Sequence, residues 1–235
     1  MSHNGERSDV FQVSDACKQL GLRAGAIVFK GVGIGPSAPG LQHLINRRIL
    51  EIKDQFATPV ALRSTPEIVR LHSLFRAVGV NPRRVQPACE RLIQMALKRG
   101  RLAQINNMVD AYNLMSVRSI CSFGAHDIDK LALPIQLRLL QGDEEFIPIG
   151  SHQKEACAAG EFAYVDSAKR VICRLDVRQA EFSKITPKAD SVLLIIGATT
   201  ALSFSQLEVL FSETTDLITK YCGGTFKTVH FPLEQ

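Results

Sequence analysis

Apolar side chains recur at helical spacing early in the chain. A short buried strand is predicted over residues 24–30, followed by a Gly/Pro loop over 31–40. The stripe after that loop falls on one face of a helix, because its members recur every three or four residues. They are Leu41, Leu44, Ile45, Ile49, Ile52 and Phe56.

Three more helices are predicted before residue 120. The first spans 66–79 with Thr65 as its cap, and the second spans 87–98 and stops at Gly100. The third covers about 107–118. The first third of the chain is therefore expected to be mostly helical.

Beyond this point the pattern changes to that of strands. Apolar and polar positions alternate over 135–139, and β-rich runs separated by polar turns follow at 163–166, 171–177 and 192–196. A long helix is predicted to close the chain, with a capping box at Ser203 and Gln206. Helices that flank a mixed β-sheet core predict an α+β fold.

The composition is that of a globular protein. The chain has 235 residues, of which 46% are apolar and 22% charged. A single domain over 1–235 is expected, since mixed folds of this length commonly form one unit. No apolar run approaches the roughly 20 residues that span a bilayer, and the N-terminus carries no signal-like segment, so we expect a cytoplasmic protein that does not enter the membrane.

Cysteines and charge limit the chemistry. The six cysteines are scattered, which argues against a zinc knuckle or a redox pair, and we expect reduced thiols. A net charge of +5 favours attraction to a phosphate backbone but does not by itself indicate nucleic-acid binding. His152 and Glu155 have helical spacing but lack a second pair, so no metal site and no cofactor are expected.

The glycines at 31, 33 and 35 follow a predicted strand and precede a helix. Backbone amides at such a junction can hold an anion. Pro36 stands where a dinucleotide-binding loop needs a glycine, and the Lys-Ser/Thr pair of a phosphate loop is absent. A plain connecting loop is the favoured interpretation.

The segment 105–130 combines polar side chains with a helical period. Asp110 and Asn113 are about one turn apart and share a face. Burying either group without a partner costs about 1–3 kcal/mol, so both need partners. Two interpretations are open: they bond to a neighbouring loop, or they line a ligand pocket.

The segment 171–186 carries a charged stripe. If it is an extended strand, Arg174, Asp176 and Arg178 project to one face, and Gln179 follows them. The stripe is either an exposed ladder of ion pairs or the wall of a site that holds an amino group and an anion.

Eight pieces of sequence, in this order, carry a family resemblance. They are Gly79-Val-Asn-Pro82, Ile105-Asn-x-x-Val-Asp-x-x-Asn113, Asp127-x-Asp-Lys130, Leu137-Arg138, Gly160-Glu161, Val171-x-Cys-Arg174, Arg178-Gln179 and Lys184-Ile-Thr186. Together they resemble the tRNA-editing module, domains three and four, of the phenylalanyl-tRNA synthetase beta subunit, and more closely its free-standing relatives. The resemblance covers about 70–225, while 1–69 fits the strand and helix portion of that module more loosely.

The resemblance implies a protein of translation quality control. It implies an aminoacyl-tRNA deacylase that acts in trans, binds the acceptor end of a mischarged tRNA rather than DNA, and lets water hydrolyse the ester. Of the candidate residues, the resemblance carries over Asn113, which matches an asparagine that helps line the module's pocket. On this basis we expect His126, Asn113 and Arg178 to act in catalysis, and Asp110, Asn113, Arg174, Asp176 and Gln179 to bind the substrate.

The chain departs from the synthetase module at two positions. The pocket histidine of the module aligns with Gly124, and His126 lies two residues later. The glutamate that reads a tyrosine hydroxyl in the module falls close to the apolar Ile196. A site without that acceptor cannot select for the hydroxyl in the same way.

Non-hydrolytic functions stay open beside the deacylase. A module that keeps the pocket without the chemistry would bind RNA or a free amino acid, and a domain that lost both would offer only an interaction surface. Ligase activity is not expected, because no stretch of the sequence resembles class II catalytic motifs. The sequence leaves open the amino acid removed, the tRNA that carries it and the oligomeric state.

Overall fold

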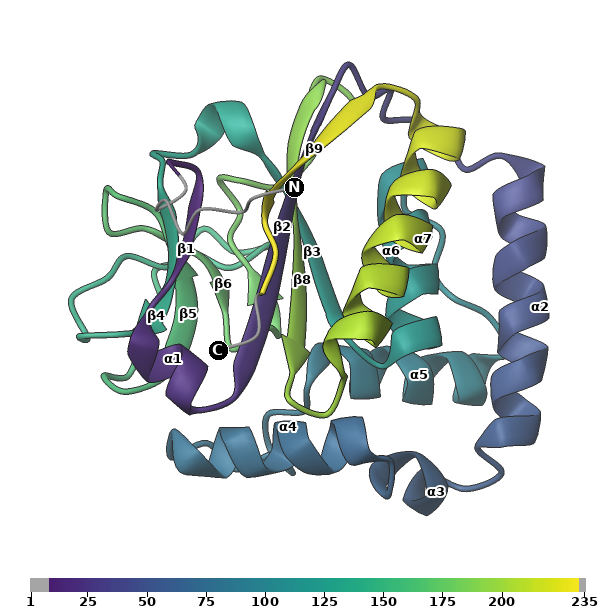
Figure 1. Ribbon diagram of the computed structural model, residues 1–235, viewed down its shortest axis with the longest axis horizontal. Helices are drawn as coiled ribbons and strands as arrows, with labels where there is room; N and C mark the ends of the chain where they lie inside the picture. The colour runs from purple at the N-terminus through teal and green to yellow at the C-terminus, as the bar shows by residue number, and fades with distance from the viewer. Residues whose placement is uncertain (1–8, 233–235) are drawn as a thin grey trace.

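Two β-sheets pack together, and helices cover the far face of one of them (Figure 1). The computed structural model describes residues 9–232. An antiparallel four-stranded sheet has the order β3-β8-β2-β9, and a five-stranded sheet has the order β1-β4-β5-β6-β7, in which β1 runs parallel to β4. The strands are β1 Phe11–Val13, β2 Leu22–Lys30, β3 Ser122–Asp127, β4 Ile135–Leu139, β5 Phe162–Val165, β6 Val171–Arg174, β7 Arg178–Gln179, β8 Ser191–Thr199 and β9 Thr225–His230.

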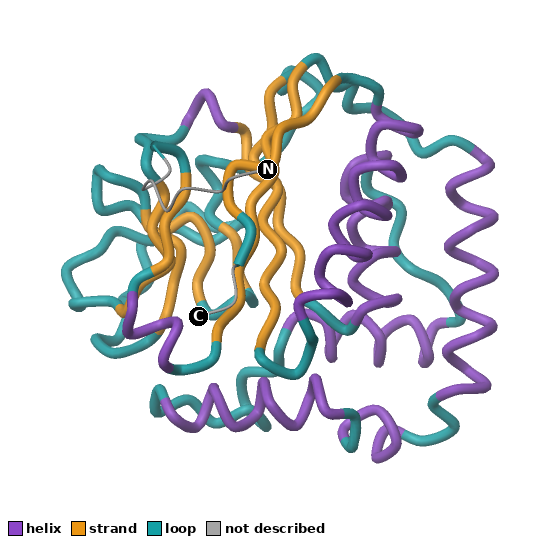
Figure 2. The backbone as a smooth tube through the Cα atoms, viewed as in Figure 1, coloured by secondary structure: helices purple, strands orange, loops and turns teal. Residues whose placement is uncertain are grey.

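Most helices gather on one side of the four-stranded sheet and beneath it, while the short first helix lies beside the five-stranded sheet, against β4 (Figure 2). They are α1 Asp15–Gln19, α2 Pro39–Gln55, α3 Pro59–Arg63, α4 Pro66–Ala77, α5 Ala88–Arg99, α6 Asn107–Ser119 and α7 Phe204–Cys222, with a 3-10 turn at Ile128–Lys130. The predicted α+β class is confirmed. The core contains two sheets, however, where the sequence pattern predicts a single mixed one.

Local signals place the helix ends as predicted. The Thr65 side chain accepts a hydrogen bond from the Ile68 amide, and Ser203 with Gln206 forms a complete capping box. Gly100 ends α5 with φ of 69°, a left-handed conformation that glycine adopts without steric cost. Within residues 9–232, no helix is long and apolar enough to cross a membrane.

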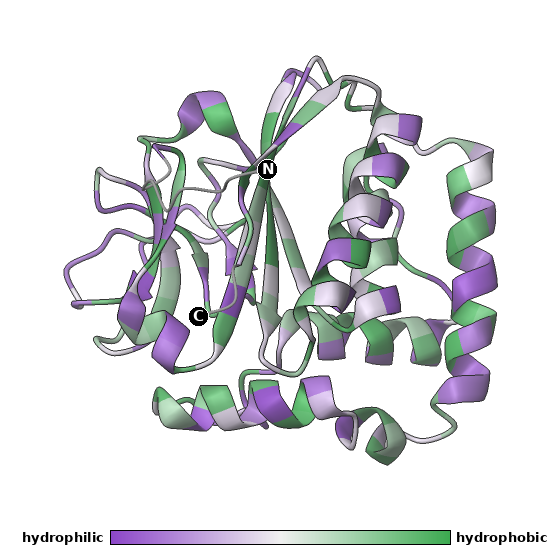
Figure 3. Cartoon of the chain, in the orientation of Figure 1, coloured by the Kyte–Doolittle hydropathy of each residue, from purple (hydrophilic) through white to green (hydrophobic). Residues whose placement is uncertain are grey.

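Strands β2 and β8 form the centre of the core. They pair along nine residues, from Leu22 opposite Thr199 to Lys30 opposite Ser191. Both strands are mostly apolar and buried, as Figure 3 shows by their pale and green colouring. Strands buried on both faces read as continuous apolar runs, which explains why the pattern predicts them correctly.

The helix layer meets the sheet closely at Gly25 of β2. A Cβ atom added there would lie 1.9 Å from Cζ of Phe211 on α7, so the ring fills the space that a side chain would take. Glycine is therefore required here by packing.

Gly25→Ala should lower the free energy of unfolding by about 1–3 kcal/mol, because the added methyl overlaps the Phe211 ring. Urea denaturation measures this change. Gly35→Ala is the matched control, since no atom lies within 4 Å of its added Cβ. Adding Phe211→Leu to Gly25→Ala should recover part of the loss; equal effects of the two glycine variants would contradict the packing argument.

Candidate functional site

A cavity lined by both polar and apolar residues lies between the two sheets, next to β3. It holds about 220 Å³ of space not occupied by atoms, part of which is open to solvent. Its lining comes from β3, β5, β6, β8 and the turn after β6. The lining residues are Ser122, Phe123, Gly124, His126, Tyr164, Cys173, Asp176 and Ile195.

Strand β3 supplies one wall through alternate residues. Ser122, Gly124 and His126 are two residues apart and therefore project to the same face of the sheet. Gly124 pairs with Ile195 of β8, which also lines the cavity. Helix α6 covers the opposite face of this sheet (Figure 1).

The opposite wall contains a tight hairpin between β6 and β7. Leu175 and Asp176 have φ of 56° and 54°, and the Val177 amide donates to the Arg174 carbonyl at 3.0 Å. Two successive left-handed residues give the turn type that suits a tight hairpin. That conformation costs non-glycine residues about 1–3 kcal/mol each, so the surrounding structure holds the turn in place.

The turn directs the Asp176 carboxylate onto β8 at Gly197. A Cβ atom added to Gly197 would lie 2.6 Å from Oδ2 of Asp176. The carboxylate therefore occupies space that exists only because residue 197 is glycine.

Four polar side-chain atoms of the lining are buried without a hydrogen-bond partner among residues 9–232. They are Ser122 Oγ, His126 Nε2, Tyr164 OH and Asp176 Oδ2. Nearly all buried polar groups in proteins are bonded, and an unsatisfied one costs about 1–3 kcal/mol. Their convergence on one cavity indicates a site built to receive a polar ligand or water.

Burial shifts the charge states of this site in two directions. It raises the pKa of Asp176 from 3.8 to about 6; the Tyr164 hydroxyl lies close enough to oppose this rise, without completing a hydrogen bond. Burial lowers the pKa of His126 to about 3. At neutral pH the cavity thus contains an ionised carboxylate and a neutral imidazole, whose Nδ1 lies 2.9 Å from Ser183 Oγ.

Gln179 also reaches the cavity. Its Nε2 lies 2.6 Å from the point where a Cβ on Gly124 would stand, and His126 Nε2 lies 3.5 Å from that point. Three of the residues selected from the sequence, His126, Asp176 and Gln179, therefore meet at one site.

The prediction that the side chains of Arg174, Asp176 and Arg178 project to one face of a strand is wrong. Strand β6 ends at Arg174, and the left-handed turn sends Asp176 into the cavity while the two arginines pair across the hairpin. Arg174 donates to Glu161 at 2.6 and 2.9 Å, and Arg178 donates to Glu155 at 2.8 and 2.7 Å. Neither arginine lines the cavity.

Asp110 fits the first of the two interpretations, in which its side chain bonds to a neighbouring loop. Its carboxylate accepts from Ser37 Oγ at 2.5 Å, from Gln42 Nε2 at 3.1 Å and from the Ile105 amide at 3.0 Å. It joins α6 to the loop before α2 and to the loop that precedes α6. Asn113, also on α6, is not among the residues that line the cavity.

Sequence reasoning missed Tyr164 and Ser122. Tyr164 lies in the run Phe-Ala-Tyr-Val of β5, which has the pattern of an ordinary core strand. Its hydroxyl is the only signal, because a buried tyrosine normally needs a partner for that group.

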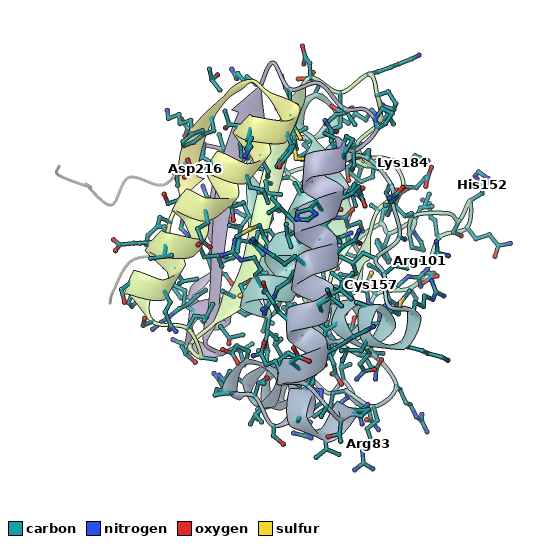
Figure 4. The ribbon with its side chains drawn as sticks, turned by 90° about the vertical axis from the view of Figure 1, so that its right-hand side faces the viewer. Arg83, Arg101, His152, Cys157, Lys184 and Asp216 are labelled. Carbon is teal, nitrogen blue, oxygen red and sulfur yellow. The ribbon has the colours of Figure 1, made fainter. Side chains whose placement is uncertain are left out.

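Two other features singled out from the sequence, the His152 pair and the glycine loop, lie outside the cavity lining. Within residues 9–232, no three His, Cys, Asp or Glu side chains are placed to hold a metal ion, and His152 projects outward from its loop (Figure 4). The Gly35 amide donates to Asn107 Oδ1 at 3.0 Å, as expected of a connecting loop. All six cysteines are buried and unpaired.

Comparison with known proteins identifies the family. Residues 71–223, well over half of the chain, match the profile of the B3/4 domain. The chain belongs to the B3/4 domain family. It is thus a relative of the B3/4 module found in phenylalanyl-tRNA synthetase beta subunits.

The match to the B3/4 domain includes every residue that lines the cavity. No curated protein matches the chain. Among solved structures, an N-terminal fragment of the phenylalanyl-tRNA synthetase beta subunit from Pyrococcus horikoshii is similar, with 12% identity and a TM-score of 0.45 over 92% of this chain and 50% of the fragment. The chain spans half the length of that fragment.

Asp176→Asn should make this B3/4 domain more stable at neutral pH. The raised pKa means that the native state favours the protonated acid; stability is full below pH 3.8 and falls as pH rises to about 6. The difference between 3.8 and about 6 corresponds to about 3 kcal/mol. Asparagine also tolerates the left-handed backbone.

Urea denaturation at pH 4 and pH 7 measures this effect. The free energy of unfolding of Asp176→Asn relative to the wild type should rise by up to about 3 kcal/mol between the two pH values. Asp216→Asn, at an exposed position of α7, is the control and should stay within about 0.5 kcal/mol at both. A pH-independent difference for Asp176→Asn would contradict the buried, unpaired carboxylate.

Proposed function

We propose that this B3/4 domain hydrolyses the ester bond of mischarged aminoacyl-tRNA, acting in trans in the cytoplasm. The observation that carries the proposal is the cavity in which a carboxylate oxygen, two hydroxyls and an imidazole nitrogen are buried without a hydrogen-bond partner in the described part of the chain. An aminoacyl ester supplies a complementary set of groups, namely a cationic ammonium and a carbonyl oxygen. The family relationship supports the same reaction class.

The ionised Asp176 is the proposed partner of the substrate ammonium. A buried carboxylate without a cation gains from a ligand that brings one, because a charge-assisted hydrogen bond is about twice as strong as a neutral one. The hydroxyls of Tyr164 and Ser122 are donors for the carbonyl oxygen as it becomes negative. Fixed donors of this kind need no reorganisation during the reaction.

The neutral His126 is proposed to orient the attacking water through Nε2. Water adds to the carbonyl carbon, the ester C–O bond breaks, and a water proton passes to the departing ribose oxygen, giving free amino acid and tRNA. The low pKa of His126 makes it a weak base, so this assignment gives it a positioning role. A hydroxyl of the terminal ribose can relay the proton without a protein base.

The cavity is narrow, because the centre of a water-sized sphere can move through only about 10 Å³ of it, which is room for about one water molecule. We therefore propose that the lining side chains shift to admit the aminoacyl group, and that the terminal adenosine lies outside the mouth. The apolar Ile195 in the lining offers no acceptor for a side-chain hydroxyl.

Arg174 and Arg178 are proposed to act through the hairpin. Their ion pairs with Glu161 and Glu155 tie both ends of the turn that carries Asp176. We therefore assign them positioning roles, and Asn113 stays a prediction without a contact to the cavity lining.

A binding module without turnover is the second candidate. It is favoured by one observation, the weak basicity of the buried His126, the imidazole of the lining. Such a module would hold the aminoacyl end of tRNA, or a free amino acid, through Asp176.

Release of amino acid from a panel of mischarged tRNAs tests the proposal. The wild type should deacylate at least one of them, Tyr164→Phe should lower kcat about 100-fold by removing an oxyanion donor, and Asp176→Asn should raise KM. Activity should fall as pH drops below about 6, because Asp176 then loses the charge that holds the ammonium. Arg118→Ala, which breaks an exposed pair with Glu213, is the control and should keep full activity.

The outcomes separate the two candidates. If all the tRNAs survive at enzyme concentrations above those of tRNA, yet aminoacyl-tRNA binds more tightly than uncharged tRNA, the binding module is correct. Absence of both activities rejects both candidates.

A further inference from the structure

A surface rich in positive charge extends over α5 and the residues before and after it. Between residues 76 and 101 the chain carries seven exposed basic residues and one acid. That acid, Glu90, is fully buried and pairs with Arg63 and His72 at 2.9 and 2.7 Å. The basic residues, here called the α5 basic surface, are Arg76, Arg83, Arg84, Arg91, Lys98, Arg99 and Arg101.

The charges of this surface are not neutralised within the protein. None of the seven side chains forms an ion pair with any residue in the described range 9–232, although arginines elsewhere pair regularly, as Arg138 does with Glu144 at 2.5 Å. In Figure 4, Arg83 lies at the lower end of the molecule and Arg101 nearer its middle. Clustered like charges repel one another, so the cluster favours an anionic partner.

Helix stability accounts for only part of the surface. Lys98 and Arg99 lie in the last turn of α5, where positive charge stabilises the helix dipole by about 0.3–1 kcal/mol each. Arg76 does the same at the end of α4. Arg83 and Arg84 in the preceding loop, and Arg91 near the start of α5, lie away from any helix C-terminus and gain no such stabilisation.

The surface adjoins the wall of the cavity. Helix α5 contacts β3, the strand that supplies Ser122, Gly124 and His126. The buried Cys89, in the first turn of α5, lies near Ser122 and Asp176 of the lining. A polyanion lying along α5 would therefore sit on the outer side of the helix whose inner side contacts the cavity strand β3.

We propose that the α5 basic surface binds the phosphate backbone of the tRNA whose aminoacyl end enters the cavity. This inference rests on the proposed function. Six of the seven residues are arginines, whose planar guanidinium groups match phosphate oxygens in pairs. No Phe, Tyr or Trp lies between residues 76 and 101, so the surface has no platform for stacking bases and reads backbone rather than sequence.

A matched pair of triple variants tests the surface. Arg83→Ala, Arg84→Ala and Arg91→Ala together remove three exposed charges from it, and Lys30→Ala, Lys188→Ala and Lys227→Ala remove three exposed, unpaired charges elsewhere. Binding of uncharged tRNA is measured by fluorescence anisotropy over a range of salt concentrations. Uncharged tRNA is used so that the result does not depend on hydrolysis.

The first triple should weaken binding at least about tenfold and reduce the slope of log K against log salt by about 2–3, since each phosphate contact contributes about 0.7–0.9. The lysine triple should bind within about twofold of the wild type. Unrelated tRNAs should compete equally, because backbone contacts carry no sequence information.

Hydrolysis of a 3′-aminoacyl-adenosine ester, which lacks the tRNA body, separates this inference from the proposed function. The arginine triple should retain wild-type kcat on that ester while KM for aminoacyl-tRNA rises. If no substrate is hydrolysed but the two triples still differ in tRNA binding, the deacylase fails and the RNA surface stands. The proposed tRNA-binding role of the surface would be overturned if both triple variants lost tRNA affinity equally or if neither lost any. Binding of the protein to anionic vesicles but not to tRNA would also overturn it.

Discussion

The antiparallel pairing of β8 with β2 on one edge and β3 on the other is the constraint on which the rest of the molecule depends. It holds β3 in register, so that Ser122, Gly124 and His126 face the second sheet together. The same sheet carries the helices on its other face, where Gly25 receives the ring of Phe211. Loss of this pairing would remove both the support of the helix layer and one wall of the cavity.

The polar groups of the cavity lower the stability of the protein, although they are the groups that could bind a ligand. A carboxylate held in a buried, strained turn, with no cation beside it, lowers the stability of the empty protein. Such a cost is commonly found where a ligand restores the balance, and the groups that destabilise the free protein are the ones to which we assign the ligand in our proposal. The ion pairs of Arg174 and Arg178 keep the turn closed without entering the site.

Local signals reveal most of the elements, and long-range contacts determine the site. Thr65, Gly100 and the Ser203 capping box mark helix ends because each acts within a few residues of itself. Strand β3 was not predicted, since its sequence Ser-Phe-Gly-Ala-His-Asp has small and polar residues on the face that lines the cavity. The direction of Asp176 depends on a turn whose Leu-Asp sequence lacks the usual glycine, and no spacing rule would have found it.

The contact between Asp176 and Gly197 couples two positions far apart in the sequence. Any side chain at 197 would occupy the volume that the acid fills, so residue 197 can gain a side chain only if residue 176 also changes or moves. Relatives with glycine at the position of Gly197 and an acid at the position of Asp176 can therefore be distinguished from those that have lost the pair. This two-residue signature would divide the family by chemistry where overall similarity is too low to do so.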